Sequence, residues 1–372
     1  MIGWITSALL FLSCAALAQE GKVAVGAVIS ESGSHAAAAT DYRNGLQLWA
    51  EEAKVDLRLK DDGSEAARAG TAYGELIAEG AQVLIGPYGS AATLTAAAEA
   101  ERARRVMLNA AGPSGQVHKR APRYVFQTVA PYTAYADAVL AAAREVGAES
   151  LFIIARDDAG SREMAEAALA QAKKLGFATD IDIYPPGTED FLAQLYRAMA
   201  AHADAWIAFA EARDGADMVK TLKRQGYVPK LFYLRSSTDP RFIAYVGQDA
   251  EFILGTKEYD ARFPNEGNAR FVQAFKAKFS SAPGALAAQA YAAGSVLSEA
   301  LRRAGTADGA KLRATLAALQ VDTVVGLYRV DPATGAQTGI KPVLTQIVKG
   351  RARAVADEVL PFVPWADREI LK

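Results

Sequence analysis

The stretch VLIGPYGSAAT, residues 83–93, combines a strand, a turn and the start of a helix. Residues 83–85 are the short apolar run of a buried parallel strand. Pro87 and Gly89 then break the strand, and Ser90 opens an alanine-rich segment typical of a helix. A helix N-terminus at the carboxyl end of a strand offers free N–H groups to an anion. The stretch therefore predicts an α/β unit with a possible ligand site at its turn.

Ser90 has two interpretations at this stage. Serine is a preferred N-cap residue, and the position of Ser90 before the alanine-rich segment suits an N-cap. Alternatively, the Ser90 hydroxyl binds a ligand oxygen at the helix N-terminus. Both interpretations stay open here, because one serine can serve both purposes.

Length and charge limit the class of protein. A chain of 372 residues suits two domains of ordinary size, each able to bury its own core. The 41 basic and 42 acidic residues nearly cancel and form no basic stripe, which argues against a nucleic-acid partner. Hydrophobic residues make up 51% of the chain, as in compact globular proteins rather than disordered ones.

The first 18 residues are interpreted as a signal peptide. Residues 2–18 carry no charge, have an apolar centre and end in ALA at 16–18, the small-x-small pattern of a secretory cleavage site. Residues 11–14 resemble a lipoprotein box only faintly, so we expect cleavage after Ala18 rather than a lipid on Cys14. Cleavage there removes the single cysteine, and the mature chain then has neither disulfides nor thiolate chemistry.

Strand-like and helix-like segments alternate along two thirds of the chain. The first series has strand-like runs at residues 22–29, 55–60, 83–85 and 106–109. After an aromatic run at 124–126, a second series has such runs at residues 151–155, 179–184, 205–209 and 231–234. This alternation predicts an α/β fold with two doubly wound, Rossmann-like lobes.

The last third is richer in helices and predicts that the chain crosses back between the lobes. Phe271, Phe275 and Phe279 mark the buried face of one helix, and Pro283 begins another. Residues 323–330 and 344–349 resemble late strands. We expect lobe 1 to comprise residues 19–123 and 256–328, and lobe 2 to comprise residues 124–255 and 329–365. Several crossings between two lobes give a hinge and an interlobe cleft.

Several short patterns resemble periplasmic binding proteins of the leucine/isoleucine/valine type, which serve ABC importers. In chain order they are VAVGAVISESG at 23–33, DDGS at 61–64, LIGPYGSAAT at 84–93, VMLNAAGPS at 106–114 and YAAGSVLSEALRRAG at 291–305. The resemblance covers roughly residues 22–350 and implies two Rossmann-like lobes that close on a ligand over a three-strand hinge. By association alone, the chain also resembles a subgroup found near quinoprotein alcohol dehydrogenases.

The resemblance implies ligand contacts from two loops of the first lobe. The family serine that takes the ligand carboxylate corresponds to Ser90, which follows Gly89. The family's fourth-strand loop supplies backbone groups and then a threonine. In this chain the loop contains Ala111, the threonine position holds Pro113, and Ser114 is the expected replacement because proline has neither an N–H nor a hydroxyl.

The second lobe departs from the family pattern. The family's acidic residue for the ligand ammonium is expected after the last strand of the second series, where this chain has Arg235 and Ser236. The family's covering aromatic residue is also unmatched, and Arg156 stands near its place. An arginine at a strand's carboxyl end can hold a carboxylate bidentately, although a salt bridge to Asp157, Asp158 or Asp239 is the alternative.

Three further side chains complete the ligand-binding candidates. Glu211 is expected to point into the cleft, where it pairs with an arginine or restores an acceptor for ammonium. Tyr88 either stacks on a ligand or packs on the adjoining turn. Ser32 lies in the turn after the first strand.

Neither a metal site nor catalysis is expected. The three histidines, His35, His118 and His202, lack ligand spacing, and His118 resembles a solvated loop residue. A nucleophile elbow needs glycine two positions on each side of the serine, where Ser90 has Tyr88 and Ala92. The chain also lacks a P-loop, a zinc helix motif and a GxGxxG opening, and no cofactor is expected.

These observations favour a periplasmic, non-enzymatic binding protein that acts as a monomer. We expect it to capture a small polar or anionic molecule, an organic acid or an amino-acid-like ligand, by hinge closure and to deliver it to an inner-membrane ABC permease. A ligand that has a carboxylate but no amine fits beside Arg235 better than leucine does, because burying the ammonium of leucine near a fixed positive charge is unfavourable. The alternatives are a ligand-sensing subunit for a membrane receptor, without transport, and a hydrolase.

Overall fold

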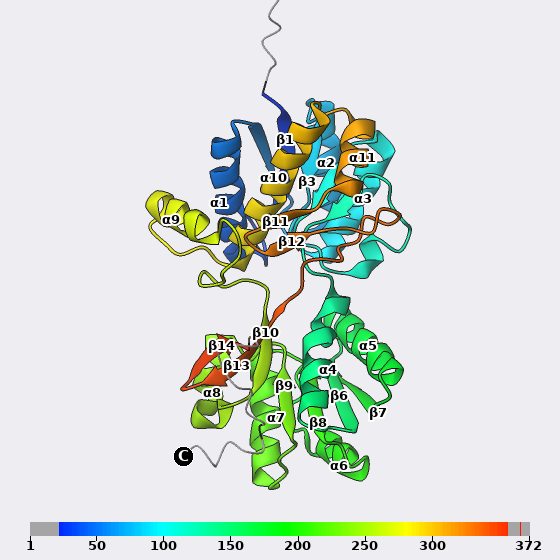
Figure 1. The fold of residues 1–372 in the computed structure, drawn as a ribbon, viewed down its shortest axis with the longest axis vertical. Helices are drawn as coiled ribbons and strands as arrows, with labels where there is room; N and C mark the ends of the chain where they lie inside the picture. The colour runs from blue at the N-terminus through cyan, green and yellow to red at the C-terminus, as the bar shows by residue number, and fades with distance from the viewer. Residues whose placement is uncertain (1–21, 356–364, 366–372) are drawn as a thin grey trace, which may run out of the picture.

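The computed structural model describes residues 22–355 and Trp365, and these residues form two lobes arranged along the long axis of Figure 1. The predicted signal peptide, with Cys14, lies outside the described residues. None of the helices in the described part is long and apolar enough to cross a membrane.

The first lobe is built on a parallel sheet with the strand order β2-β1-β3-β4-β5. Its strands are β1 (Ala24–Ile29), β2 (Asp56–Asp61), β3 (Val83–Ile85), β4 (Met107–Asn109) and β5 (Val125–Gln127). Its helices are α1 (Ala36–Ala53), α2 (Ala66–Ala78), α3 (Ser90–Ala103), α9 (Asn268–Phe279), α10 (Ala285–Ala304) and α11 (Gly309–Ala318). Separate cores on the two faces of the sheet, one with α1 and α10 and one with α2 and α3, make this lobe doubly wound.

The second lobe has the strand order β14-β13-β10-β9-β8-β6-β7. Its strands are β6 (Ser150–Arg156), β7 (Ala178–Tyr184), β8 (Ala205–Phe209), β9 (Leu231–Leu234), β10 (Leu254–Lys257), β13 (Val343–Val348) and β14 (Arg351–Ala354). Its helices are α4 (Tyr135–Glu145), α5 (Ala159–Lys174), α6 (Leu192–Ala200), α7 (Ala212–Arg224) and α8 (Pro240–Val246). The parallel part, β7-β6-β8-β9-β10, repeats the strand order of the first lobe, and β13 and β14 add an antiparallel edge.

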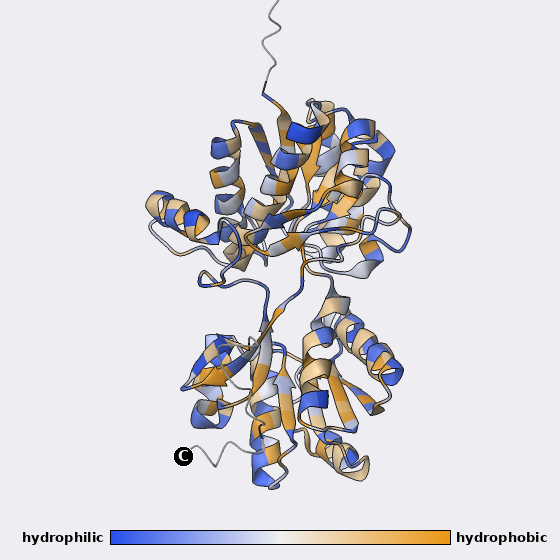
Figure 2. Ribbon diagram, viewed as in Figure 1, coloured by the Kyte–Doolittle hydropathy of each residue, from blue (hydrophilic) through white to orange (hydrophobic). Residues whose placement is uncertain are grey.

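Apolar strands at the centre of each lobe explain why the sequence alternation predicts the fold. All residues of β3, β8 and β9 are buried, and these strands are mostly orange in Figure 2, while the outer faces of the helices carry blue segments. Strands buried on both faces read as continuous apolar runs. The expected α/β fold with two doubly wound lobes is confirmed.

Three segments connect the lobes in Figure 1: residues 128–134, 258–267 and 329–342. The first crossing begins after β5, because Val125 pairs with Met107 of β4 and keeps β5 in the first sheet. The third segment runs along the first lobe before it crosses, since Gln127 N–H donates to Gly335 O at 2.9 Å. The crossings therefore lie several residues beyond the expected boundaries at 123/124 and 328/329.

The late strand expected at residues 323–330 is a hairpin instead. Its strands are β11 (Val321–Thr323) and β12 (Gly326–Tyr328), which pair antiparallel. The β-branched run before residue 326 is typical of one continuous strand. The chain instead reverses at Val324 and Val325, and Gly326, which follows, adopts a φ of 114° that side-chain-bearing residues rarely reach.

Candidate ligand-binding site between the lobes

A cavity of about 340 Å³ lies between the lobes beside the hinge, within the size range of small-molecule sites. The first lobe and the hinge side of α10 contribute His35, Tyr88, Gly89, Ser90, Ala111, Pro113, Ala285, Leu286 and Gln289. The connections contribute Val129, Tyr132 and Glu258, and the second lobe contributes Arg235. The structure thus brings together five of the predicted ligand-binding residues, namely Tyr88, Gly89, Ser90, Ala111 and Arg235.

Ser90 is not the N-cap of α3, so that interpretation is wrong by one residue. Gly89 occupies the N-cap with a φ of 89°, and the helix begins at Ser90 without a side-chain cap. The Ser90 Oγ accepts a hydrogen bond from the backbone N–H of Ser114 at 3.1 Å. A hydroxyl that accepts one bond still has its own proton to donate, and Ser90 lines the cavity.

Buried hydrogen bonds hold the turn between β3 and α3. Tyr42 of α1 is fully buried and donates its hydroxyl to the Gly86 carbonyl. Burial raises the pKa of Tyr42, which keeps this hydroxyl protonated as a donor. Gly89 N–H donates to Ala111 O at 3.0 Å, and Thr93 Oγ1 donates to Gly89 O at 2.9 Å. The N-terminus of α3 is therefore presented to the cavity by a well-anchored loop.

Asn109 shapes the adjoining loop after β4. Its side chain donates to Gly112 O at 2.8 Å and accepts from Gly112 N–H at 2.9 Å. A Cβ on Gly112 would lie 2.4 Å from Thr93 Oγ1, so only glycine fits this closely packed position. This packing fixes the backbone of Ala111 beside the cavity.

Tyr88 packs against a ring of the first lobe. Its ring lies edge-on to His35, with the ring centroids 5.3 Å apart. Both rings line the cavity and form an aromatic wall next to Ser90. Such a wall suits the apolar part of a small ligand.

Arg235 and Glu258 form the charged side of the cavity. Their nearest charged atoms are 3.9 Å apart, a loose ion pair that leaves both groups with unused hydrogen-bonding capacity. The Arg235 guanidinium lies 5.8 Å from the ring centre of Tyr135. Glu258 also accepts hydrogen bonds from the Tyr135 hydroxyl and, at 2.7 Å, from Gln289 Nε2. The cavity therefore presents one fixed cation and one carboxylate.

Tyr135 is held as a donor in this group. Burial, followed by the neighbouring Glu258 carboxylate, raises the pKa of Tyr135 well above its usual value. The protonated hydroxyl restrains Glu258, while the ring supports Arg235. This arrangement limits the rotamer freedom that Arg235 would otherwise lose on binding a ligand.

Three predicted ligand-binding residues lie elsewhere. Arg156 faces Asp214 at 3.9 Å rather than one of the aspartates expected as its partner. Glu211 is exposed at the start of α7 and does not line the cavity, although it was expected to point into the cleft. Ser32 donates its hydroxyl to Asp61 at 2.6 Å and is likewise outside the cavity lining.

Ser114, the expected replacement for the family threonine, makes its side-chain contact across the lobes. Its hydroxyl donates to Glu163 Oε2 at 2.5 Å, and Gly115 N–H donates to Glu163 Oε1 at 2.7 Å. Ser114 contributes to the site through its backbone bond to Ser90 rather than as part of the cavity lining.

Sequence reasoning missed Glu258, Gln289, Tyr132 and Glu163. A signal existed for Glu258 alone, because it directly follows the short strand β10 and so lies at the carboxyl edge of the sheet. The other three reach the site from helices or from a connection, where no local pattern marks them.

The expectation that His118 is solvated is wrong. His118 is only 4% exposed, and its Nδ1 lies 2.9 Å from the Thr334 carbonyl oxygen. Burial lowers the pKa of His118, with the Thr334 hydrogen bond opposing this shift. The buried ring links the first lobe to the third connection between the lobes.

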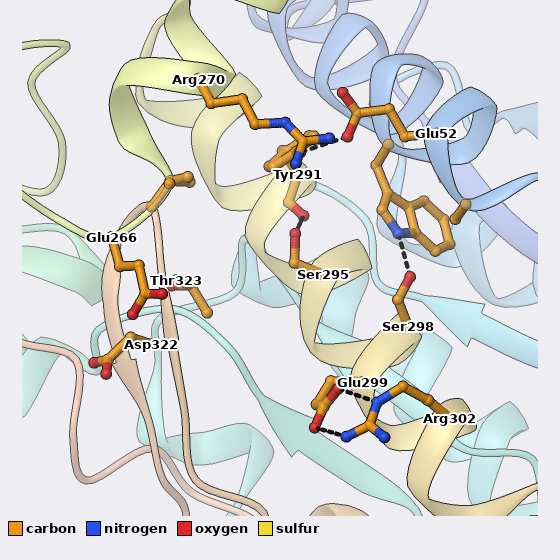
Figure 3. A pocket seen from close by; sticks show the side chains of 14 residues that line it. Glu52, Glu266, Arg270, Tyr291, Ser295, Ser298, Glu299, Arg302, Asp322 and Thr323 are labelled. Atoms are coloured by element: carbon orange, nitrogen blue, oxygen red, sulfur yellow. Dashed lines mark hydrogen bonds and ion pairs between the residues drawn. The ribbon is translucent and has the colours of Figure 1, made fainter.

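A larger cavity of about 510 Å³ lies on the first lobe, among α1, α9, α10 and β11 (Figure 3). Much of its polar lining is paired internally: Trp49 donates to Ser298, Tyr291 to Glu52, and Arg302 pairs with Glu299. Its lining comes from the first lobe and, through Glu266 and Gly267, from the end of the second connection, but not from the second lobe, so lobe closure would not act on a ligand there. The smaller interlobe cavity is therefore the better candidate. No group of three or more potential metal ligands occurs among the described residues.

Two α/β lobes with the same strand order, joined by three connections beside a cavity, define a two-lobed architecture with a candidate small-molecule site between its lobes. The chain belongs to the periplasmic binding protein family, whose model matches residues 22–351. This is a family of solute-binding proteins, not of enzymes.

Solved structures agree with this fold. A leucine binding protein from Thermotoga maritima is 22% identical, with a TM-score of 0.72, and the match covers 90% of this chain and 98% of that one. An ABC transporter substrate-binding protein from Desulfitobacterium hafniense, in complex with leucine, is 23% identical with a TM-score of 0.73, over 90% and 100% of the two chains. A branched-chain amino acid binding protein from Streptococcus pneumoniae, in complex with isoleucine, is 18% identical with a TM-score of 0.70, over 90% and 98%.

Proposed function

We propose that this protein is the solute-binding component of an ABC transporter and captures a small carboxylate-bearing molecule between its lobes. The observation that carries the proposal is that Ser90, at the N-terminus of α3, and Arg235, from the other lobe, line the same cavity. Both groups favour a carboxylate, the first through hydroxyl and N–H donors and the second through its guanidinium. A ligand that bridges them has a higher affinity for the closed arrangement and therefore stabilises it.

The proposed ligand is an amino acid or the corresponding acid without the amine. Glu258 supports an amino acid, because it gives the cavity an acceptor for ammonium that Glu211 does not supply. The solved structures with bound leucine and isoleucine support the same choice. Arg235 supports the deaminated acid, because its charge opposes an ammonium nearby.

A thermal-shift screen tests the proposal and separates the two ligands. Leucine and valine are compared with their deaminated counterparts, isocaproate and isovalerate. A concentration-dependent rise in melting temperature with at least one member of each pair is expected, since binding to the native state alone stabilises it. A shift with leucine and valine but not with the acids would remove the acid from the proposal. No shift with any of the four would contradict a carboxylate site of this size.

Membership of the family supports a proposal for the cellular location and the partner of this protein. We place the mature protein in the periplasm as a monomer that delivers its ligand to an inner-membrane ABC permease. Intact-mass measurement of the exported protein is expected to give a chain beginning at Gln19. Co-purification with the permease, in the presence of a ligand from the screen, tests the partner, and recovery of a membrane receptor instead would support a sensing role.

A further inference from the structure

A carboxylate of the second lobe reaches into the loop that supports Ser90. Glu163 lies on α5, and both of its oxygens are used on the first lobe. Oε2 accepts from the Ser114 hydroxyl at 2.5 Å, and Oε1 accepts from the Gly115 N–H at 2.7 Å. Hydrogen bonds to a carboxylate are shorter and stronger than neutral ones. This contact ties the lobes together outside the three chain connections.

The same loop holds the ligand-facing serine. Ser114 is only 6% exposed, and its backbone N–H donates to Ser90 Oγ at 3.1 Å. This bond occupies one lone pair of the Ser90 hydroxyl oxygen. The Ser90 hydroxyl proton is then donated to another acceptor. Ser90 lines the interlobe cavity, so a ligand carboxylate is the acceptor that the geometry offers.

We propose that Glu163 is a positioning residue for the ligand: by holding Ser114, it orients the Ser90 hydroxyl as a donor into the cavity. The inference rests on the proposed function, because it requires a carboxylate on Ser90. It adds that the donor geometry of the first lobe depends on a side chain of the second lobe. The link runs through Ser114, whose hydroxyl donates to Glu163 and whose backbone N–H donates to Ser90 Oγ, so that holding the Ser114 side chain also holds the N–H that orients the Ser90 hydroxyl.

The test compares Glu163→Gln with Glu166→Gln, an exposed glutamate on the same helix. In Glu163→Gln the amide group faces one of the two donors, so one hydrogen bond is lost with little change in shape. Calorimetry with leucine and isocaproate as probes is expected to show affinity about three- to tenfold weaker for Glu163→Gln. Ser114→Ala is expected to reproduce this loss, and the Glu166→Gln control is expected to bind like the unchanged protein.

A double-mutant comparison distinguishes positioning from a general structural effect. If Glu163 acts through Ser90, Glu163→Gln changes affinity by less than about twofold once Ser90→Ala is present. If Glu163→Gln weakens ligand affinity as much in the Ser90→Ala background as it does alone, the inference is overturned. It is also overturned if Ser90→Ala weakens binding but Glu163→Gln alone leaves the affinity unchanged. In both of those cases the proposed function survives. If the unchanged protein binds neither probe, the carboxylate site and the inference both fail.

Discussion

The two lobes share one strand order but offer different loops to the cavity. In the first lobe, β1 and β3 flank the point where the strand order reverses, the usual ligand position in open α/β sheets. The segments after these strands supply His35, Tyr88 and Ser90 to the cavity. The first lobe therefore follows the general rule for this fold.

The second lobe does not follow it. The equivalent strands β6 and β8 lead to Arg156 and Glu211, and neither residue lines the cavity. Arg156 instead faces Asp214, which also accepts the Tyr184 hydroxyl at 2.7 Å. The cavity takes its charged groups from positions after β9 and β10, on the hinge side of the sheet. The shared topology therefore gives each lobe an equivalent set of strand ends at which a ligand could bind. In the second lobe, the arginine at this place is paired with Asp214 instead.

The comparison of the two lobes predicts the largest difference in ligand affinity for substitutions of the two arginines, Arg235 and Arg156. Arg235→Gln is expected to weaken binding of the ligand found in the screen by about 2–3 kcal/mol, because a charge-assisted bond to the ligand carboxylate is lost. Arg156→Gln is the matched change at the equivalent edge and is expected to alter binding by less than about 0.5 kcal/mol. Calorimetry on both variants checks this, and similar losses in both would refute the difference between the lobes.

A second pair of variants compares the two helix starts. Ser90→Ala is expected to weaken binding by about 1–2 kcal/mol and to change the melting temperature little, because Gly89 is the N-cap of α3. Asp158 does cap its helix, since it accepts from Ser161 N–H at 2.9 Å. Asp158→Ala is therefore expected to cost about 1 kcal/mol of unfolding free energy with unchanged affinity. Calorimetry and urea unfolding of both variants check this. A stability loss in Ser90→Ala with unchanged affinity, or an affinity loss in Asp158→Ala with unchanged stability, would contradict it.

The first lobe could be predicted in greater detail than the second. Its ligand-facing residues directly follow β3 and β4, so the apolar runs locate them in the sequence. Sequence also predicted strand β9 at its observed bounds and placed Arg235 after it. These residues have local signals, because the carboxyl ends of parallel strands share one edge of the sheet.

The parts that could not be predicted depend on contacts between distant segments. Strand β10 contains Gly255, which weakens the strand pattern but is required because a Cβ would lie 2.0 Å from Ser237 Oγ. Missing this strand meant missing Glu258. Arg156 pairs with Asp214, 58 positions away, and Glu163 pairs with Ser114, 49 positions away, while neighbouring carboxylates were equally good partners in the sequence.

Glu258 permits a sharper test of the charged side of the cavity. Glu258→Gln removes the negative charge that would pair with an ammonium and leaves Arg235 without its ion-pair partner. Leucine is expected to lose about 1 kcal/mol of binding free energy, while isocaproate is expected to bind equally well or better. The ratio of the two dissociation constants, measured by calorimetry, checks this. An equal change for both probes would mean that Glu258 supports the site without choosing its ligand.

The smallest expected effect concerns the third connection, which the first lobe holds through His118. Burial lowers the pKa of His118 relative to its value in the unfolded chain, about 6.5. As the pH falls, the unfolded chain therefore binds the proton first, and the stabilisation present above about pH 6.5 decreases as the pH approaches the folded pKa. We expect a loss of about 1 kcal/mol or less between about pH 7.5 and 5.

Urea unfolding of His118→Asn measures this contribution, because asparagine does not titrate and its amide can still donate to Thr334 O. The unfolding free energy of this variant is expected to fall less with acidification than that of the unchanged protein. His202→Asn in the second lobe is the control, since His202 is exposed and asparagine tolerates its φ of 48°. If both variants show the same pH dependence as the unchanged protein, His118 is not the titrating contact. A reduced dependence in His118→Asn alone would identify His118 as a group whose protonation destabilises the folded protein, because its buried ring loses solvation when it becomes charged.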